Sequence, residues 1–589
     1  MTVEKLITDH IDIWSSALQT RSTAGRGSNG KIDLYGIKKL RELILELAVR
    51  GKLVPQDPND EPASELLKQI AKERDELVKS KAIRKPKALE KIAIINTPFD
   101  LPDGWEWCYL NDIGDWGAGA TPSRSNSKYY NGDIPWFKSG ELSSDFISES
   151  EESVTELALQ ECSLRDNKVG DVLIAMYGAT IGKTSILNVR GTTNQAVCAC
   201  TPYSGISNIY LLTLLKAYKR VFIGMGAGGA QPNISREKLI ATIFALPPKN
   251  EQKRIIHKVD ELMSLCDQLE QQSLNRLDAH LQLVEILLAT LTDSQNAEEL
   301  AENWARISQH FDTLFTTEAS IDALKQTILQ LAVMGKLVPQ NPHDEPASEL
   351  LKRIEQEKAQ LVKEGKIKKQ KPLPPVSDEE KPFELPMGWE WCRIGDIIAN
   401  MDAGWSPACS PEPSPKEDIW GVLKTTAVQS LEYREQENKT LPNTKLPRPE
   451  YEVHEGDILV TRAGPKNRVG VSCLVEKTRS KLMISDKIIR FHLISDDISA
   501  KYISLCLNRG VTADYLEASK SGMAESQMNI SQENLRSAPV ALPPTAIQLK
   551  VISTIEEFFK VCDQLKSRLQ SAQQTQLHLA DALTDAALN

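Results

Sequence analysis

The fold is decided by a stretch that the chain contains twice: Leu47-Ala-Val-Arg-Gly-Lys-Leu-Val-Pro-Gln-Asp-Pro-Asn-Asp-Glu-Pro-Ala-Ser-Glu-Leu-Leu-Lys68. It returns 284 positions later (331 minus 47) as Leu331-Ala-Val-Met-Gly-Lys-Leu-Val-Pro-Gln-Asn-Pro-His-Asp-Glu-Pro-Ala-Ser-Glu-Leu-Leu-Lys352. At the same offset, Pro98-Phe-Asp-Leu-Pro-Asp-Gly-Trp-Glu-Trp-Cys108 returns as Pro382-Phe-Glu-Leu-Pro-Met-Gly-Trp-Glu-Trp-Cys392. A repeat this long is too large for a solenoid unit. It predicts a duplicated helical frame that holds two dissimilar inserts.

The composition is that of an ordinary globular protein. The chain has 589 residues, 41% hydrophobic and 25% charged, and a formal net charge of −10. This length suits about three to four structural units. No apolar run approaches the roughly 20 residues that cross a bilayer, and the start lacks a secretory signal, so we expect a cytoplasmic protein. The acidic net charge argues against non-specific binding to polyanions by the chain alone.

The segmentation follows from the repeats. We predict an N-terminal helical region over 1–95 with a flexible linker at 20–30, a central helical spacer over 249–380 and a C-terminal helix over 545–589. Between them lie insert 1, residues 96–248, and insert 2, residues 381–544. Each insert contains short apolar runs with turn residues between them, which indicates strands. The expected fold class is α+β, with two mixed α/β domains separated by long helical connectors.

Two apolar stripes predict that the connectors pair. Ile255, Val259, Leu262, Cys266 and Leu269 follow heptad spacing, and so do Val551, Ile555, Phe558, Cys562, Leu565 and Leu569. An intramolecular antiparallel coiled coil is therefore expected. In addition, Ile7-Thr-Asp-His-Ile-Asp-Ile-Trp14 resembles Ile307-Ser-Gln-His-Phe-Asp-Thr-Leu314, so the N-terminal segment matches the chain that follows the central helix. We therefore expect the termini to meet in a circular arrangement with pseudo-twofold symmetry.

Motifs for catalysis are not visible in the sequence. Gly178-Ala-Thr-Ile-Gly-Lys-Thr184 has three residues between its glycines, whereas a phosphate-binding loop needs four, so a strand-turn-strand is expected there. No nucleophile triad, dinucleotide fingerprint or Asn/Asp-Pro-Pro-aromatic tetrapeptide is present. The ten cysteines lack zinc-like spacing and are expected to be buried and reduced. We predict neither a catalytic residue nor a metal site.

The inserts carry polar, basic and aromatic loop residues suited to DNA. Arg and Lys match guanine edges and phosphates, while Asn and Gln match adenine edges. For any one of them a turn or a solvated surface is the alternative, and Trp105, Trp107 and Trp136 are more often core residues. The DNA-contact candidates are Thr121, Ser123, Arg124, Lys128, Tyr129, Lys138, Ser139, Lys183, Asn194 and Gln195 in insert 1, and Lys424, Thr425, Arg462, Lys466, Asn467 and Arg468 in insert 2.

The whole chain resembles the specificity subunits of type I DNA restriction–modification enzymes. The resemblance is carried by Thr121-Pro-Ser123, Ile134-Pro-Trp-Phe-Lys-Ser-Gly-Glu-Leu142, Gly170-Asp-Val-Leu173, Thr193-Asn-Gln-Ala196, the Asn-Ile-Ser motifs and the Ala-Leu-Pro-Pro-x-x-x-Gln motifs. The Leu-Ala-Val-x-Gly-Lys-Leu-Val-Pro-Gln repeat resembles the IB, or EcoAI-like, branch. Insert 2 departs from the pattern, with Gly404-Trp-Ser-Pro407 and Trp420-Gly-Val-Leu-Lys424 in place of the first two motifs.

This resemblance implies a non-catalytic recognition function. Each insert would be a target recognition domain that reads one half of an asymmetric bipartite target in double-stranded DNA. The helices would set the unread gap and dock two methyltransferase subunits, and two restriction/translocase subunits would complete the assembly. The chain itself would bind no cofactor, and S-adenosylmethionine, ATP and Mg²⁺ are expected on the partner subunits. A different class of function stays open from the residues alone: a helical scaffold with two protein-binding modules.

Overall fold

The computed structural model describes residues 3–21, 31–93, 97–226, 232–415 and 417–588. The chain divides into two compact units, which are described separately. Of the described residues, those in 3–275 and 572–588 form unit 1, and those in 276–571 form unit 2. Residues from the C-terminal end therefore pack with those from the N-terminal end. Residues 20 and 21 of the predicted linker at 20–30 lie in β1 (Gln19–Arg21), which pairs with β2 (Lys31–Asp33), and residues 22–30 lie outside the described ranges.

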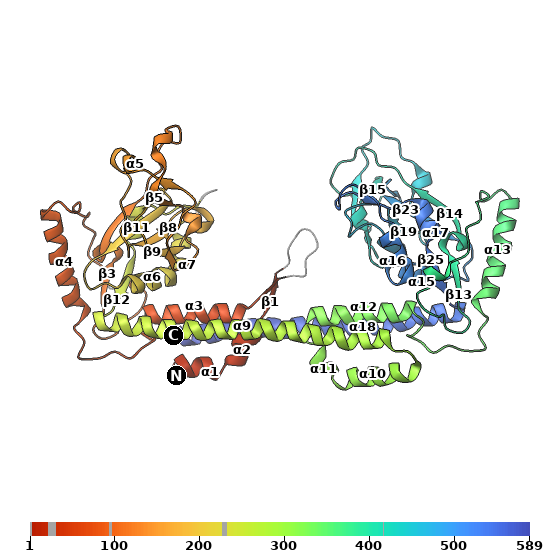
Figure 1. Cartoon of the computed structure of the whole chain (residues 1–589), viewed down its shortest axis with the longest axis horizontal. Coiled ribbons are helices and arrows are strands. Elements are labelled where there is room, and N and C mark those ends of the chain that lie inside the picture. The colour runs from red at the N-terminus through yellow and green to blue at the C-terminus, as the bar shows by residue number, and fades with distance from the viewer. Residues whose placement is uncertain (1–2, 22–30, 94–96, 227–231, 416, 589) are drawn as a thin grey trace. The chain divides into compact units, whose positions relative to one another are not determined.

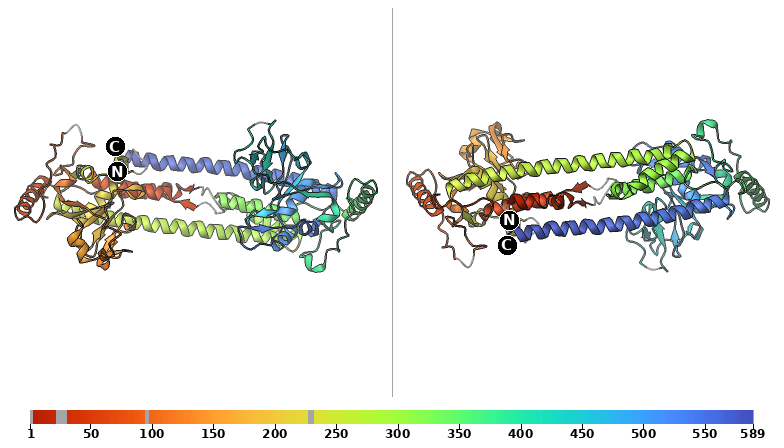
Figure 2. Two further views of the ribbon diagram at one scale, coloured as in Figure 1. Left: turned by 90° about the horizontal axis from the view of Figure 1, so that it is seen from above. Right: turned by 90° about the horizontal axis from the view of Figure 1, so that it is seen from below.

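The helical part of unit 1 is arranged around α3 (Tyr35–Val49). Arg41 Nη2 lies 2.6 Å from Asp267 Oδ1 on the first part of α9 (Lys249–Asp293). On the other side, Tyr35 Oη donates a 2.8 Å hydrogen bond to Asp581 Oδ1 near the end of α18 (Thr545–Leu588). Helix α3 therefore contacts both long helices, and Figure 2 shows it beside the end of α18. The remaining helices of this part are α1 (Val3–Thr8), α2 (Ile11–Ser16) and α4 (Ala63–Lys79).

Unit 2 repeats this arrangement with α12 (Glu318–Val333) in the place of α3. Lys325 Nζ lies 2.5 Å from Asp563 Oδ1 on α18, and Lys336 Nζ donates to the Thr292 carbonyl at the end of α9. The accompanying helices are α10 (Ala297–Gln309), α11 (Phe311–Leu314) and α13 (Ala347–Lys363). One large apolar cluster joins these helices to insert 2.

The heptad positions face the protein interior, but a third helix takes part in the packing. Ile255, Val259, Leu262, Cys266 and Leu269 are all buried, and so are Val551, Ile555 and Cys562. Within each unit, some of the polar contacts of the long helices are with α3 or α12. A direct antiparallel pairing of α9 with α18 therefore stays a prediction.

The expected relation between the N-terminal segment and the central segment is visible in the helices. His10 is the N-cap of α2 and His310 is the N-cap of α11, with similar backbone angles. The apolar partners match as well, because Ile7 and Trp14 are buried in unit 1, and Ile307 and Leu314 are buried in unit 2. The two segments are thus the same structural element.

The two halves of the repeated sequence pack on each other, which explains why they recur together. Gly51 has φ +67° and Gly335 has φ +71°, a left-handed conformation that favours glycine. A Cβ on Gly51 would meet Trp105 at 3.0 Å, and one on Gly335 would meet Trp389 at 2.9 Å. In each unit the connector therefore contacts the Gly-Trp-Glu-Trp motif at the start of the insert.

Insert 1 is built from three sheets within the described residues. The five-stranded sheet has the order β4-β11-β8-β9-β6, and the parallel pair β10-β5 continues into β7. Strand β3 pairs with β12 where the insert leaves and rejoins the connector. The strands are β3 (Glu106–Tyr109), β4 (Gly114–Ala118), β5 (Tyr130–Phe137), β6 (Phe146–Ile147), β7 (Ser153–Val154), β8 (Val172–Ala175), β9 (Thr184–Leu187), β10 (Thr192–Thr193), β11 (Val197–Pro202) and β12 (Ile243–Leu246). The helices are α5 (Glu156–Glu161), α6 (Asn208–Ala217), α7 (Lys219–Met225) and α8 (Arg236–Ile240) (Figure 1).

Insert 2 has the same topology despite its different sequence. Its four-stranded sheet, β14-β23-β19-β21, corresponds to β4-β11-β8-β9, and its parallel pair β15-β22 corresponds to β5-β10. The strands are β13 (Glu390–Arg393), β14 (Ile398–Ala403), β15 (Gly421–Leu423), β16 (Val428–Gln429), β17 (Glu432–Tyr433), β18 (Asn438–Thr440), β19 (Ile458–Thr461), β20 (Ala463–Gly464), β21 (Ser472–Leu474), β22 (Leu482–Met483), β23 (Ile488–Leu493), β24 (Met528–Asn529) and β25 (Pro539–Leu542). The helices are α14 (Ile394–Ile397), α15 (Ala500–Asn508), α16 (Val511–Ala518) and α17 (Gln532–Ser537). The predicted α+β class with two domains and long helices is confirmed.

Two of the recurring motifs have structural functions. In Asn-Ile-Ser, the hydroxyls of Ser235 and Ser531 cap α8 and α17 by accepting from the Lys238 and Asn534 amides. In Ala-Leu-Pro-Pro-x-x-x-Gln, the buried Gln252 and Gln548 accept from the backbone amides of Ser207 and Ser499, which begin α6 and α15. These motifs therefore fix the inserts to the long helices.

The described residues contain no helix that is both long and apolar enough to span a membrane. All ten cysteines are free thiols, and eight of them are buried, as expected. Burial raises the pKa of the Cys198 thiol to about 12, so it stays protonated and packs as a small apolar group.

Candidate nucleic-acid interface

The candidate surface of insert 1 begins where the parallel strands β5 and β10 end. Their register pairs Thr192 with Trp136 and Thr193 with Phe137. The Asn194 amide then donates a 3.0 Å hydrogen bond to the Phe137 carbonyl, which turns the chain back toward β11. Lys138 follows β5 directly, so Lys138, Asn194 and Gln195 lie at one edge of the sheet.

A third segment crosses this edge after β4. The Ala120 amide donates a 3.0 Å hydrogen bond to the Thr193 carbonyl. A Cβ on Gly119 would collide with the Thr193 carbonyl oxygen, so only glycine lets the two backbones approach this closely. The Thr121 hydroxyl, two residues later, donates to Gln195 Oε1. Thr121 and Gln195 are both exposed.

Arg124 and Lys138 share one carboxylate. Glu152 lies 2.6 Å from Arg124 Nη1 and 2.5 Å from Lys138 Nζ. The two cations lower the pKa of Glu152 to about 2, with the hydrogen bonds to Arg124 first and to Lys138 second. The Arg124 guanidinium also lies over the rings of Tyr130 and Trp136, at 4.7 and 5.2 Å from their centroids. The basic side chains of Arg124 and Lys138 are therefore held in fixed positions at the sheet edge.

Lys183 reaches the same edge from the turn between β8 and β9. Its Nζ lies 3.4 Å from the carbonyl oxygen of Gly140, the residue after Ser139. Strands β8 and β9 are antiparallel, so the Gly178 to Thr184 segment is a strand-turn-strand, as expected from its spacing.

Three other candidates in insert 1 lie on the segment that leads into β5. Ser123 contacts the Ser125 hydroxyl, and Lys128 is exposed. Tyr129 donates a 2.9 Å hydrogen bond to Glu161 on α5, and this carboxylate raises the pKa of the tyrosine. No described contact joins Lys128 or Tyr129 to the sheet edge.

Insert 2 forms an equivalent edge with β15 and β22. The Trp405 amide donates a 3.1 Å hydrogen bond to the Ile484 carbonyl, which matches the bond from Ala120 to Thr193. A Cβ on Gly404 would collide with that carbonyl. The Ser406 hydroxyl donates to Asp486 Oδ1, as Thr121 does to Gln195. By this register, Ser406 corresponds to Thr121 and Asp486 to Gln195.

A cavity of about 250 Å³ lies beside the Ser406–Asp486 pair. Lys424 and Thr425, both predicted candidates, line it on one side. The other polar residues of its wall are Ser406, Lys439, Ser485 and Lys487. Lys424 follows β15 directly, as Lys138 follows β5.

Arg468 supports this edge from beneath. Its guanidinium donates to Gln429 Oε1 at 2.8 Å and to the carbonyls of Thr425 and Val428 at 2.7 and 2.8 Å. Burial lowers the pKa of Arg468, with the neighbouring Arg434 contributing less. Three protein acceptors thus occupy a side chain that the sequence offered as a DNA contact.

The remaining candidates of insert 2 lie along the longer turn between β19 and β21. The Arg462 amide donates to the Lys487 carbonyl at 2.7 Å, which places it next to the sheet edge. Lys466 lies 3.6 Å from Glu525 at the tip of the turn, and Asn467 beside it is exposed. The contacts bring Arg462 close to the edge and place Lys466 and Asn467 farther along the turn.

Five residues of this edge were not among the sequence candidates: Ser406, Lys439, Ser485, Asp486 and Lys487. The pattern Gly-x-Ser/Thr-Pro, shared by Gly119 to Pro122 and Gly404 to Pro407, is the signal that could have found Ser406. Asp486 had no such signal, because nothing in the sequence aligns it with Gln195. Of the aromatics that were expected to be core residues, Trp105 and Trp136 are buried.

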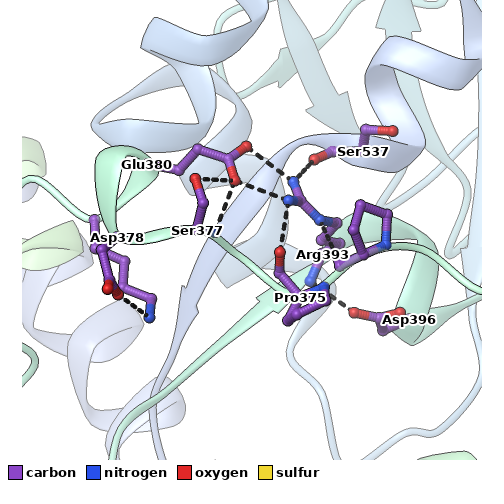
Figure 3. Close-up of polar contacts among 9 residues, drawn as sticks. Pro375, Ser377, Asp378, Glu380, Arg393, Asp396 and Ser537 are labelled. Carbon is purple, nitrogen blue, oxygen red and sulfur yellow. Dashed lines mark hydrogen bonds and ion pairs between the residues drawn. The ribbon is translucent and has the colours of Figure 1, made fainter.

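A buried arginine fixes insert 2 to the chain that leads into it (Figure 3). Arg393 donates to the carbonyls of Pro374 and Pro375 and pairs with Glu380, with Nη2 2.8 Å from Oε2. This guanidinium lowers the pKa of Glu380 to about 2. Unit 1 uses Tyr109 at the same position, where its hydroxyl donates to the Glu90 carbonyl at 3.0 Å.

Comparison with known proteins adds an independent observation. The family model "Type I restriction modification DNA specificity domain" matches residues 102–279 and 386–573. The chain is 70% identical to the type I restriction enzyme EcoEI specificity subunit of Escherichia coli, and both chains are covered completely. It is 47% identical to the EcoAI specificity subunit of Escherichia coli, again over the whole of both chains. This relationship supports the EcoAI-like branch.

Solved structures give a looser match. The HsdS subunit from Thermoanaerobacter tengcongensis, known from a crystal structure, is 15% identical in sequence to this chain. It covers 84% of this chain and 99% of that chain with a TM-score of 0.39, which is too low to support an argument. The family model and the full-length relatives carry the assignment. The chain belongs to the type I restriction–modification DNA specificity family and is a specificity subunit, not a catalytic one.

Proposed function

We propose that insert 1 and insert 2 each read one half of an asymmetric bipartite DNA target, and so direct both adenine methylation and restriction. One observation carries this proposal: the two inserts place different side chains at the same edge of the same scaffold. Insert 1 presents Thr121 and Gln195, and insert 2 presents Ser406 and Asp486. An asymmetric target requires this difference, because each half-site offers its own pattern of donors and acceptors.

The candidate residues take different parts in this reading. We assign the sheet edge, with Thr121, Gln195, Lys138 and Lys424, to the DNA bases and nearby phosphates. Exposed cations away from the edge, such as Lys128 and Lys466, suit phosphates alone. Arg468 and Tyr129 are held by protein acceptors, so we assign them to positioning the loops rather than to DNA contact.

The helices act as the spacer and the docking surface in this proposal. Residues 1–95, 249–380 and 545–589 form the spacer, with an antiparallel, pseudo-twofold arrangement of the long helices. Equivalent ion pairs, Arg41 with Asp267 and Lys325 with Asp563, support two like surfaces. Two identical methyltransferase subunits fit such surfaces, and two restriction subunits complete the cytoplasmic complex. S-adenosylmethionine, ATP and Mg²⁺ belong to these partners.

The net charge of −10 disfavours DNA binding by the chain alone. We expect weak binding by the isolated subunit, and tight, salt-sensitive binding once the methyltransferase subunits contribute their phosphate contacts. Fluorescence anisotropy of labelled duplexes over a salt series measures both. Tight specific binding by the isolated subunit would contradict this division of the contacts.

Methylation mapping tests the function itself. The chain is expressed with its methyltransferase subunit in a host without other adenine methylation, and methylated adenines are located by sequencing. The expected result is one bipartite motif with an unread gap of fixed length. Methylation at a single continuous motif, or none in the presence of a functional methyltransferase, would contradict the two-reader proposal.

A further inference from the structure

We propose that Asp486 is a specificity-determining residue of insert 2, and that it selects a cytosine or an adenine by accepting a hydrogen bond from the amino group that the base presents in the major groove. The amino group is N4 of cytosine or N6 of adenine. This inference rests on the proposed function, because it requires insert 2 to bind DNA. It names the kind of base that one side chain of the sheet edge accepts.

The position of Asp486 is defined by the scaffold and not by the loop sequence. In both inserts, a glycine segment crosses the parallel strand pair and donates one backbone hydrogen bond to the second strand. In both, the residue two positions after that glycine carries a hydroxyl, Thr121 or Ser406. This hydroxyl donates a hydrogen bond to the side chain of Gln195 or Asp486, which lies in the turn after the second strand. Gln195 and Asp486 therefore occupy the same point of two otherwise divergent surfaces.

Asp486 is oriented but still has a free acceptor. The Ser406 hydroxyl donates to Oδ1, and the Asp486 amide donates to the same hydroxyl at 3.3 Å. Within the described ranges, no hydrogen bond or ion pair occupies Oδ2. The side chain is exposed, whereas Ile484 and Ser485 before it are buried. A carboxylate that is fixed at one oxygen and open at the other can accept from a ligand without losing much side-chain freedom.

The charge around Asp486 argues for a base rather than a phosphate. Lys424, Lys439 and Lys487 line the adjoining cavity, and none of the described ion pairs joins them to Asp486. These lysines suit the DNA backbone, but a bare carboxylate beside a phosphate is repelled. On a DNA-binding surface, a carboxylate is tolerated where it accepts a hydrogen bond from an amino group. The three lysines can therefore bind phosphates while Asp486 accepts from the edge of a base.

The chemistry of the carboxylate then restricts the base. An ionised aspartate only accepts hydrogen bonds. Cytosine N4 and adenine N6 donate in the major groove, whereas guanine O6 and N7 and thymine O4 accept. Gln195 both donates and accepts, which suits the N6/N7 edge of adenine. The two inserts thus present different hydrogen-bonding groups at this matched position of the sheet edge.

The test uses the complex with its methyltransferase subunit and compares D486N with D496N. Asp496 is an exposed acid elsewhere in insert 2, so D496N removes the same charge away from the edge. Because asparagine also donates, D486N should relax or change one base pair of the half-site read by insert 2. Discrimination at that position should fall about 5- to 150-fold, as for one lost base contact. The other half-site, and both half-sites in D496N, should be unchanged.

Base analogues in the wild-type complex separate the two sources of the amino group. Competition binding uses duplexes in which each adenine of the half-site is replaced by purine, and each cytosine by 2-pyrimidinone, which lack the amino group. At one position, loss of the amino group should lower the affinity of the wild-type complex but not that of D486N. The base at that position shows whether Asp486 accepts from adenine or from cytosine. An unchanged motif in D486N, or a penalty that persists in it, would overturn the inference. If wild-type complex yields no bipartite motif, the proposed function fails instead.

Discussion

At the scale of single residues, Glu152 keeps two DNA-contact candidates in place and also competes for them. It pairs with Arg124 at 2.6 Å and Lys138 at 2.5 Å, and DNA phosphates would have to replace it. An exposed ion pair of this kind contributes little stability. Its main effect is on the charge that insert 1 offers to DNA.

The substitution E152Q should therefore raise DNA affinity. Freed from the carboxylate, Arg124 and Lys138 can both neutralise phosphates, and we expect an increase of about 3- to 10-fold at low salt with a steeper salt dependence. Anisotropy titrations of the methyltransferase complex over a salt series measure this. E149Q, an exposed acid in the same loop, is the matched control. Equal effects of both variants would mean that only net charge matters.

The residues of the site were only partly predictable from the sequence. Thr121, Lys138 and Lys424 could be named as candidates because they belong to a motif or follow an apolar strand. Asp486 could not, since its place depends on the register between β15 and β22, which no local pattern encodes. Arg468 was chosen for its charge, although the sequence could not reveal that its guanidinium donates to the carbonyls of Thr425 and Val428.

At the scale of the elements, the close crossing at Gly119 joins the segments of the proposed DNA-reading edge. A Cβ there would collide with the carbonyls of Thr193 and Asn194. G119A should cost about 1–3 kcal/mol of unfolding free energy, as other overpacked sites do, and should displace the 194–195 turn. Specific DNA binding by the complex should fall more than 10-fold, close to the affinity for unrelated DNA.

Gly224 provides the control for this substitution. It lies on α7 of the same insert, away from the sheet edge, and a Cβ on it would meet nothing within 4 Å. G224A should therefore leave both the melting temperature and the methylated motif unchanged. Normal recognition by a folded G119A protein would show that the crossing does not position the reading edge.

The element that leads into insert 2 predicts a response to acid. Arg393 lowers the pKa of Glu380 from its usual 4.5 to about 2, so the ionised pair contributes its full stability above pH 4.5. That contribution is lost as the pH falls from 4.5 toward 2. E380Q should be less stable at pH 7 and should lose less stability over this acid range, as measured by urea unfolding. E379Q, at an exposed neighbour, should behave as wild type.

The repeats and the buried faces of the long helices were well predicted, whereas the pairing of these helices stays a prediction. The periodic stripes on α9 and α18 correctly marked buried faces, because burial alone sets that pattern. The partner of each stripe is not encoded by its period. Helices α3 and α12 contact the long helices through Arg41 and Lys325, residues that the heptad pattern did not single out.

At the scale of the whole molecule, the two inserts should be exchangeable one at a time. Each has its own sheets and its own attachment through Gln252 or Gln548. Replacing residues 96–248 by the insert of another family member should change one half-site and keep the other, with the gap unaltered. Methylation mapping of the chimaera measures this. A change in both half-sites would contradict independent reading.

The composition of unit 1 bears on how the protein is made. Residues 572–589 belong to unit 1, where Asp581 accepts from Tyr35 and pairs with Lys39, and Lys52 reaches the Leu588 carbonyl. Synthesis from the N-terminus therefore supplies every main segment of unit 2 before the last segment of unit 1. The first domain to leave the ribosome is the last to be completed. A ribosome that stops after Ser571 would release a chain in which unit 2 is complete. Unit 1 of that chain would lack the end of α18 and its contacts with α3.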